Sequence, residues 1–206
     1  WLRLAEQGDI ANLEAPLYAW RKLPTAKSSA EPSRWRERFS FMGRERMIVR
    51  RMSKISSRPG FFREDLAAAL TTQAVSAALL EEWETACNAL QAAWQLAGDW
   101  LHAGAFAEVV EEAIGLRASE WVGWAVMPAL LQQILDRLPN GAKPRGVDAL
   151  LVRLYRHAAF EAHVRGQPQQ VRQAAWEYWR RRPLSLFTDR GMASIWLQSW
   201  RRSVHA

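Results

Sequence analysis

The chain has 206 residues, a length that allows one or two domains, and 49% of them are hydrophobic, which is enough to bury a core. Ala, Leu, Arg and Glu dominate while β-branched residues are sparse, a balance that favours helices. Cys87 is the single cysteine, so an internal disulfide is excluded, in keeping with a reducing, cytoplasmic compartment.

The formal net charge of +7 is distributed unevenly along the chain. Residues 21–63 carry thirteen Lys/Arg against three acids, residues 64–136 one against eleven, and residues 137–206 thirteen against four. Two interpretations stay open. Either the basic ends bind an anionic partner, or the acidic middle packs near the ends and neutralises them.

The first predicted elements form a small α/β unit. A helix over residues 1–7 ends at Gly8, where a left-handed residue commonly follows a helix. Short strands are predicted over residues 10–13 and 17–20. Pro16 separates them because proline lacks the N–H that a central strand needs.

As a string of residues, WLRLAEQGDIANLEAPLYAWRKLP resembles the end of the catalytic domain of family 2 glycosyltransferases, which have the GT-A fold. The resemblance covers residues 1–28. It rests on five matches: Trp1 to Ala5, Gly8, Ala11 to Leu13, Pro16-Leu17 and Trp20-Arg21. It departs at Leu23-Pro24-Thr25, where many members have a His-Pro-Gly turn, so a metal or phosphate role of that His is absent.

The resemblance implies that the catalytic Asp, the metal-binding aspartates and the nucleotide-binding strands lie upstream of Trp1. We therefore expect a piece of a longer enzyme, whose nucleotide-sugar and divalent metal bind outside this piece. Residues 1–30 would be the remnant of the GT-A-like domain with its linker, and residues 31–206 a helical C-terminal extension. Four residues would lie on the acceptor side by resemblance: Trp1, Arg3, Trp20 and Arg21.

After a polar linker over residues 22–34, the pattern becomes helical. Ser33 is predicted to cap a basic helix that ends near Lys54. A long amphipathic helix follows from about Phe62 to Ala97, with an interruption at Thr71-Thr72 left open.

Two later segments are typical of tetratricopeptide-like hairpins, in which two helices flank a Gly-containing turn. They pair residues 86–103 with 106–114 across Gly104, and residues 147–164 with 169–181 across Gly166. Residues 140–144 form a loop between the two halves. Residues 121–135 predict a buried helix, kinked or broken at Pro128, that is too short and too polar to span a membrane.

The tail from His157 to Trp200 resembles the helical C-terminal extension of many bacterial family 2 glycosyltransferases. In that extension a tetratricopeptide-like pair ends in Pro, here Pro183, before a turn at Arg190-Gly191 and a last apolar helix to Trp200. The predicted fold is therefore mainly α: a helical bundle with tetratricopeptide-like hairpins, preceded by a short α/β remnant of a GT-A-like domain.

Residues that could carry catalysis are scattered. Glu108 and Glu112 share a helix face at i, i+4 spacing, but no further ligand converges on them, and solvated helix faces are the simpler interpretation. The four histidines show no metal-ligand spacing, and no P-loop, GxGxxG or nucleophile elbow is present. No catalytic residue or metal ligand is assigned within the chain.

Clusters of Arg beside Trp are the remaining candidates for binding. Arg with Trp suits an anionic membrane interface, where indole sits at headgroup depth and Arg contacts phosphate. Alternatively Trp forms core and Arg the solubilising face. The candidate contacts are Arg34, Arg36, Arg44, Arg50, Arg51, Trp176, Trp179, Arg180, Arg181, Arg182, Trp200 and Arg201.

The working hypothesis is a glycosyltransferase fragment that serves transfer of a sugar to an acceptor such as an envelope or lipid-linked glycan. Its helical region would contact acceptor, membrane or partner, peripherally at the inner face of the membrane. The alternative is a non-catalytic helical module that binds protein or anionic membrane through its Trp/Arg faces. Nucleic acid ranks third, because no reader motif supports it.

Overall fold

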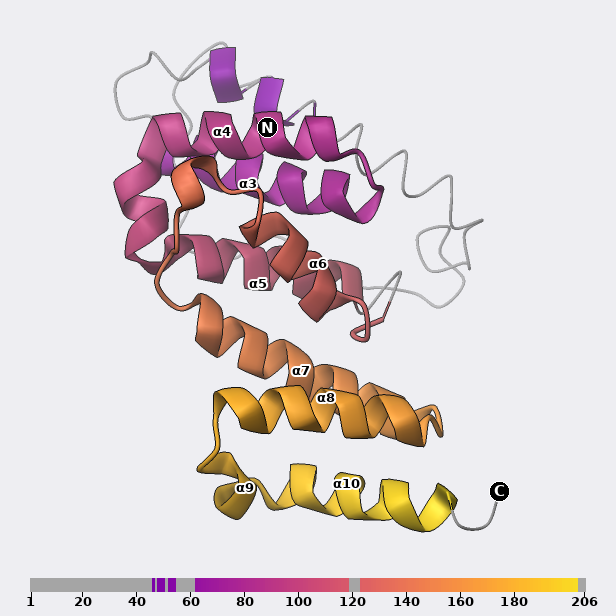
Figure 1. Ribbon diagram of the computed structural model, residues 1–206. Helices are drawn as coiled ribbons and strands as arrows, with labels where there is room; N and C mark the ends of the chain where they lie inside the picture. Colours follow the sequence, from indigo (N-terminus) through magenta and orange to yellow (C-terminus); the bar gives the residue numbers. More distant parts are fainter. Residues whose placement is uncertain (1–45, 47, 51, 55–61, 119–122, 204–206) are drawn as a thin grey trace, which may run out of the picture.

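The computed structural model describes residues 46, 48–50, 52–54, 62–118 and 123–203. Within these residues all regular structure is helical, which confirms the prediction of a mainly α fold (Figure 1). The α/β remnant predicted over residues 1–30 lies outside the described residues. In chain order the elements are α3 (Arg63–Leu79), α4 (Trp83–Trp100), the π-helical η1 (Leu101–Ala105), α5 (Phe106–Arg117), α6 (Met127–Leu135), the 3-10 turn η3 (Pro139–Gly141), α7 (Val147–Val164), α8 (Pro168–Arg181), α9 (Ser185–Thr188) and α10 (Arg190–Ser203).

A first core surrounds α3, which packs against both α4 and α5. Small side chains such as Ala67, Ala74 and Ala77 are fully buried, so neighbouring helices approach α3 closely on more than one side. A helix that is apolar on several faces is expected to be buried in this way. The first half of α7 and the apolar side of α6 complete this core, through residues such as Leu131 and Leu150.

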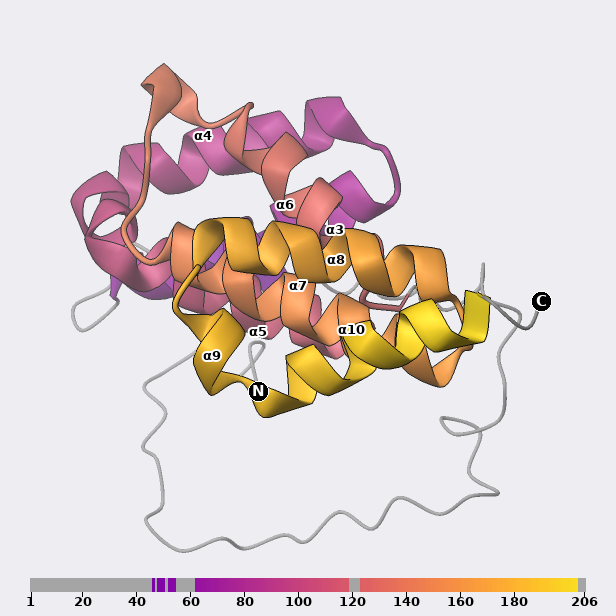
Figure 2. The same cartoon turned by 60° about the horizontal axis from the view of Figure 1, so that its bottom comes forward.

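A second core joins α7, from Val152 to Ala162, to α8 and α10. Ala159 and Ala175 are fully buried where α7 and α8 pack as an antiparallel pair, and Met192 fills the contact with α10 (Figure 2). The turn between α7 and α8 passes through Gly166 at φ 69°, a conformation that favours glycine. The helix–Gly–helix unit predicted for this segment is therefore present.

The helical stretch predicted from about Phe62 to Ala97 consists of two helices, because α3 ends at Leu79 and α4 begins at Trp83. The break contains neither Gly nor Pro: Glu81 adopts φ 61°, and the N–H of Glu82 donates to the Ala77 carbonyl at 2.9 Å. Thr71 does not interrupt α3, since its buried hydroxyl donates to the carbonyl four residues earlier.

The turn predicted at Gly104 is present, with φ 141°. The predicted pairing of residues 86–103 with residues 106–114 is not the main packing of these helices. α3 packs along α4, and α5 packs against α3. A Gly turn in the sequence marks where a helix ends, but it does not determine which face of the next helix is apolar.

Two predicted breaks are the starts of helices. Pro128 lies in the first turn of α6 rather than kinking a longer helix, a position where its missing N–H removes no intrahelical bond. Arg190-Gly191 is the first turn of α10 rather than a loop, because the Asp189 carboxylate accepts the N–H of Met192 at 3.1 Å. Asp is among the best residues for this capping role.

The acidic middle segment contacts both basic segments. Arg46 pairs with Glu82 at 2.6 Å, and Arg153 of α7 donates to Glu111 of α5 at 2.6 Å. The interpretation in which the middle neutralises the ends therefore holds at these two points. Over the residues given above, no helix combines the length and the apolar character needed to cross a bilayer.

Candidate functional site

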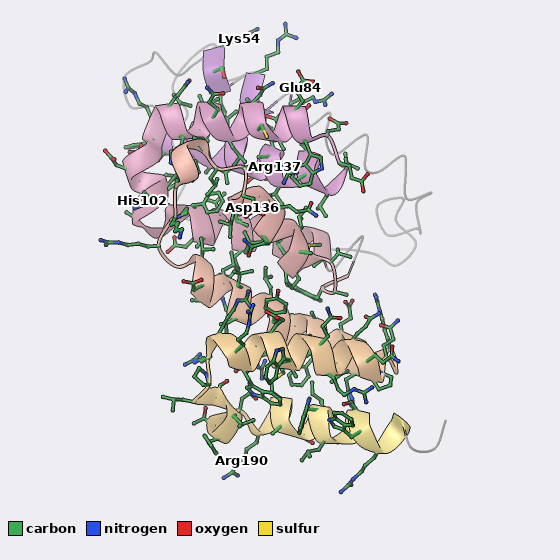
Figure 3. All side chains as sticks on the ribbon, in the orientation of Figure 1. Lys54, Glu84, His102, Asp136, Arg137 and Arg190 are labelled. Carbon is green, nitrogen blue, oxygen red and sulfur yellow. The ribbon has the colours of Figure 1, made fainter. Side chains whose placement is uncertain are left out.

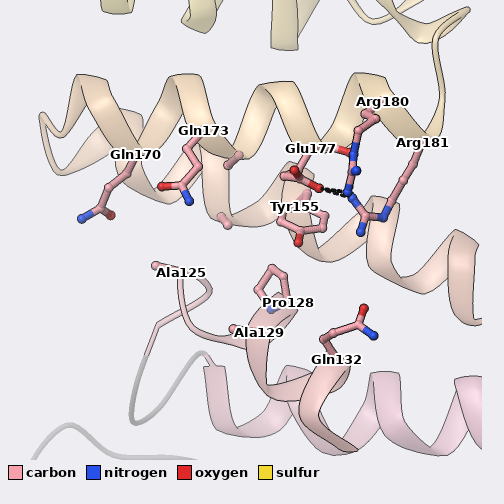
Figure 4. Close-up of a pocket in the computed structure, with 12 residues that line it drawn as sticks. Ala125, Pro128, Ala129, Gln132, Tyr155, Gln170, Gln173, Glu177, Arg180 and Arg181 are labelled. Carbon is pink, nitrogen blue, oxygen red and sulfur yellow. Dashed lines mark hydrogen bonds and ion pairs between the residues drawn. The ribbon is translucent and has the colours of Figure 1, made fainter. Parts of the chain in front are cut away.

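A hollow of about 610 Å³ lies between α6 and α8, over α7 (Figure 4). We call it the α6/α8 groove. Its floor is made of small or ring-shaped apolar side chains, which leave room for another chain to approach. These are Ala125, Pro128, Ala129, Ala158 and Ala174.

Glutamine side chains lie along both sides of the α6/α8 groove. Gln170 and Gln173 extend from α8 toward the opening, and Gln132 extends from α6 on the other side (Figure 4). Each amide has donors and an acceptor, so the rims offer both kinds of hydrogen bond to a ligand.

One end of the groove is charged. The Glu177 carboxylate accepts from Arg180 at 2.9 Å and also from Arg181, its neighbours at i+3 and i+4 on α8. The hydrogen bond from Arg181, followed by Arg180, lowers the pKa of Glu177 below its ordinary value. Arg181 also lies over the ring of Tyr155, 4.8 Å from its centroid. Two guanidinium groups thus share one carboxylate, which leaves this end positive.

The other end of the groove is fixed by a carboxylate of α7. Glu161 accepts the backbone N–H of Trp124 at 2.6 Å and that of Ala125 at 3.1 Å. The ring of Trp124 stacks on His157 with centroids 4.3 Å apart. Burial, followed by the charge of Arg156, lowers the pKa of His157. The turn before α6 is therefore held to α7 by backbone and ring contacts together.

Some of the tryptophans that were predicted to lie on a binding surface are packed between helices. Trp179 of α8 and Trp196 of α10 meet edge to face at 5.4 Å, and both pack against the second core. Trp196 continues to Trp200 at 6.0 Å, and Arg172 lies over Trp200 at 4.5 Å. Trp179 is thus a packing residue between two helices, while the prediction that it contacts an anionic surface stays a prediction. Trp176, 66% exposed, and Trp200 do present indole to solvent.

The predicted arginines differ in the same way. Arg181 is half-buried and bound to Glu177, whereas Arg50, Arg180, Arg182 and Arg201 are exposed. The other predicted site residues lie outside the described part of the chain: Trp1, Arg3, Trp20, Arg21, Arg34, Arg36, Arg44 and Arg51.

A feature that the sequence interpretation missed is the connection between α8 and α10, residues 182–190, which we call the α9 tip. Leu184 and Phe187 are 77% and 82% exposed, and Leu186 is 46% exposed. The signal in the sequence is the run Leu-Ser-Leu-Phe, separated from three arginines by Pro183 alone. The pattern around Pro183 predicts only the end of a hairpin.

Comparisons with protein-family models, with curated proteins and with solved structures found no match to this chain. Over the residues that the structure covers, no group of three or more His, Cys, Asp or Glu side chains is placed to hold a metal ion.

Proposed function

We propose that the helical region works as a binding module, and that the α6/α8 groove binds a short peptide segment of a partner protein. The observation that carries the proposal is the lining of the groove. A floor of Ala and Pro lies between rims of glutamine, with positive charge at one end.

The shape favours a peptide over a small molecule. Small-molecule sites enclose most of their ligand in a largely apolar cavity. The α6/α8 groove instead lies open between two helices and is polar along both rims (Figure 4). Small floor residues such as Ala129 and Ala174 let a main chain approach, and amides such as Gln173 match its alternating N–H and C=O groups. Arg180 would then take a carboxylate of the peptide.

The test is a selection of peptides from a random display library on the folded 206-residue protein. The affinity of the selected sequence is then measured by fluorescence anisotropy. Ala129→Trp places an indole across the groove from an exposed position, and we expect it to weaken binding at least tenfold. Ala149→Trp is the matched control, because Ala149 is likewise an exposed third residue of its helix but does not line the groove. Equal binding by both variants, or no common sequence among the selected peptides, would contradict the proposal.

The resemblance at residues 1–28 supports a second proposal, in which this module belongs to a family 2 glycosyltransferase. Sugar transfer from a nucleotide-sugar, with a divalent metal, would then occur in a domain that the resemblance places upstream of Trp1. The groove would hold an acceptor-bearing or partner protein near that domain.

A further inference from the structure

The α9 tip exposes apolar side chains in a fixed geometry. Ser185 is buried, and its hydroxyl donates to the Arg182 carbonyl at 2.6 Å. The N–H of Asp189 donates to the Ser185 carbonyl at 2.8 Å. These bonds close one compact helical turn that holds Leu184 and Phe187 outward. Large apolar side chains gathered at an exposed site commonly mark a surface that meets a partner or a membrane.

The charge displayed by the tip is positive. Arg182 and Arg190 flank the apolar side chains and are exposed, and Arg190 extends away from the body of the molecule (Figure 3). The one acid of the tip, Asp189, is turned inward: Arg156 donates to it at 2.8 Å and the Tyr178 hydroxyl at 3.0 Å. An approaching surface therefore meets apolar groups and guanidinium groups.

We propose that the α9 tip docks on an anionic phospholipid bilayer. Leu184 and Phe187 would enter the headgroup region, and Arg182 and Arg190 would contact lipid phosphates. Apolar residues at the acyl boundary with basic residues beside them are the combination by which peripheral proteins bind anionic membranes. The inference is independent of the proposed peptide groove, since Leu184, Phe187, Arg182 and Arg190 all lie outside it.

The size of the tip favours a bilayer over a second protein. A stable protein interface buries about 800 Å² on each partner. Such an interface takes roughly 20–30 residues from each partner, whereas the α9 tip consists of residues 182–190 alone. A bilayer needs no shaped partner surface, and its charge complements the two arginines.

The experiment is co-sedimentation of the 206-residue protein with vesicles of phosphatidylcholine, with or without phosphatidylglycerol. We expect binding only to the anionic vesicles, and weaker binding as salt screens the arginines. Leu184→Ser with Phe187→Ser should lower the partition coefficient at least tenfold. Arg182→Gln with Arg190→Gln should lower it and reduce its dependence on salt. Leu197→Ser is the matched control, since Leu197 is an exposed apolar residue of α10 outside the tip, and it should bind as the wild type does.

Three results would overturn the inference. The first is equal binding to neutral and anionic vesicles. The second is unchanged binding by the Leu184/Phe187 double variant while circular dichroism shows it folded. The third is self-association in sedimentation equilibrium that the same double variant abolishes, without vesicle binding by the wild type, because the tip would then join two copies of the chain.

Discussion

Arg156 of α7 donates through Nε to Oδ2 of Asp189 at 2.8 Å, while Oδ1 of the same carboxylate caps α10 at the N–H of Met192. The Tyr178 hydroxyl of α8 donates to Oδ2 as well, at 3.0 Å. Burial raises the pKa of Asp189, but the bonds from Arg156, Met192 and Tyr178 outweigh it, so the pKa is lowered overall. The pKa of Arg156 is raised, mainly by its bond to this carboxylate. One side chain thus connects three helices of the second core.

Replacing Asp189 should therefore destabilise the protein more than breaking an exposed ion pair. Asp189→Asn keeps a good capping residue but removes the charge, and we expect it to cost about 1–3 kcal/mol of unfolding free energy. Glu111→Gln, which breaks the exposed pair with Arg153, should cost no more than about 1 kcal/mol. Urea unfolding at neutral pH measures both. Equal losses would show that the Asp189 charge has no special role.

The lowered pKa of Asp189 predicts that the stability of the protein depends on pH. Because the folded-state pKa of Asp189 is lowered, the unfolded chain binds the proton more readily than the folded protein does. Its contribution is complete above the unfolded pKa of about 3.9 and is lost as the pH falls through the folded-state pKa. The gap in unfolding free energy between wild type and Asp189→Asn should thus narrow in acid, as urea titrations at successive pH values would measure. A gap that is constant with pH would contradict the assignment.

His157 should titrate below an ordinary histidine, because it is partly buried against Trp124 and lies near Arg156. NMR measures this by following the histidine ring protons from about pH 8 to about pH 4, a range that brackets the reference pKa of about 6.5. His157→Gln assigns the signal. Arg156→Met should raise the pKa of His157, because it removes a positive charge that disfavours the protonated ring. Glu111→Gln should lower the pKa of His157 below its wild-type value, since the negative charge of Glu111 favours the protonated ring. Shifts of the same sign in both variants would exclude this electrostatic account.

Gly123 should tolerate a side chain less well than Gly166, although both have positive φ, of 80° and 69°. A Cβ at Gly123 would lie 2.7 Å from Oε1 of Glu161, whereas nothing lies within 4 Å of one at Gly166. Gly166→Ala should cost about 1–2 kcal/mol from the backbone alone. Gly123→Ala should cost more, because Glu161 must also move from the N–H groups that it accepts. Thermal unfolding measures the stability that each variant loses. Equal losses of stability would mean that the Glu161 side chain can move aside without cost.

The 206-residue protein should not turn over nucleotide-sugars. If the proposed relation to family 2 glycosyltransferases holds, the catalytic Asp and the metal-binding aspartates would lie outside these 206 residues. The measurement is release of the nucleotide from a panel of nucleotide-sugars with Mg²⁺ or Mn²⁺. Turnover above a heat-denatured sample would place a catalytic site within this chain.

Local sequence signals predicted the ends of several helices but not their packing. The α7–Gly166–α8 unit followed from residue spacing, because a left-handed glycine ends a helix whatever surrounds it. The break between α3 and α4 did not, because Glu81 adopts positive φ without being Gly, Asn or Asp, and the apolar spacing continues on both sides. Because α3 and α4 face the same core, their apolar residues follow one continuous spacing in the sequence, as they would in a single helix.

The two tryptophans of α8 show the same limit of local sequence signals. The sequence places Trp179 and Trp176 three residues apart on α8, and both appear equally suited to a surface. Only packing distinguishes them: Trp179 contacts Trp196 of α10 edge to face, while Trp176 remains exposed. The α6/α8 groove could not be predicted at all, since its floor and rims come from three helices and its residues, mostly Ala and Gln, carry no motif.

The division of α7 between two cores has a consequence for cooperativity. Leu150 and Leu154 belong to the first core, whereas Ala159 and Ala162 belong to the second. The two sets overlap along α7, since Val152 of the second core precedes Leu154 of the first. Both cores therefore pack on one unbroken 18-residue helix, and they are expected to open together rather than as separate units. A ligand in the α6/α8 groove rests on Tyr155 and Ala158, at the point where the two cores meet. Its binding energy would therefore protect the amides of both cores from hydrogen exchange, including those far from the ligand.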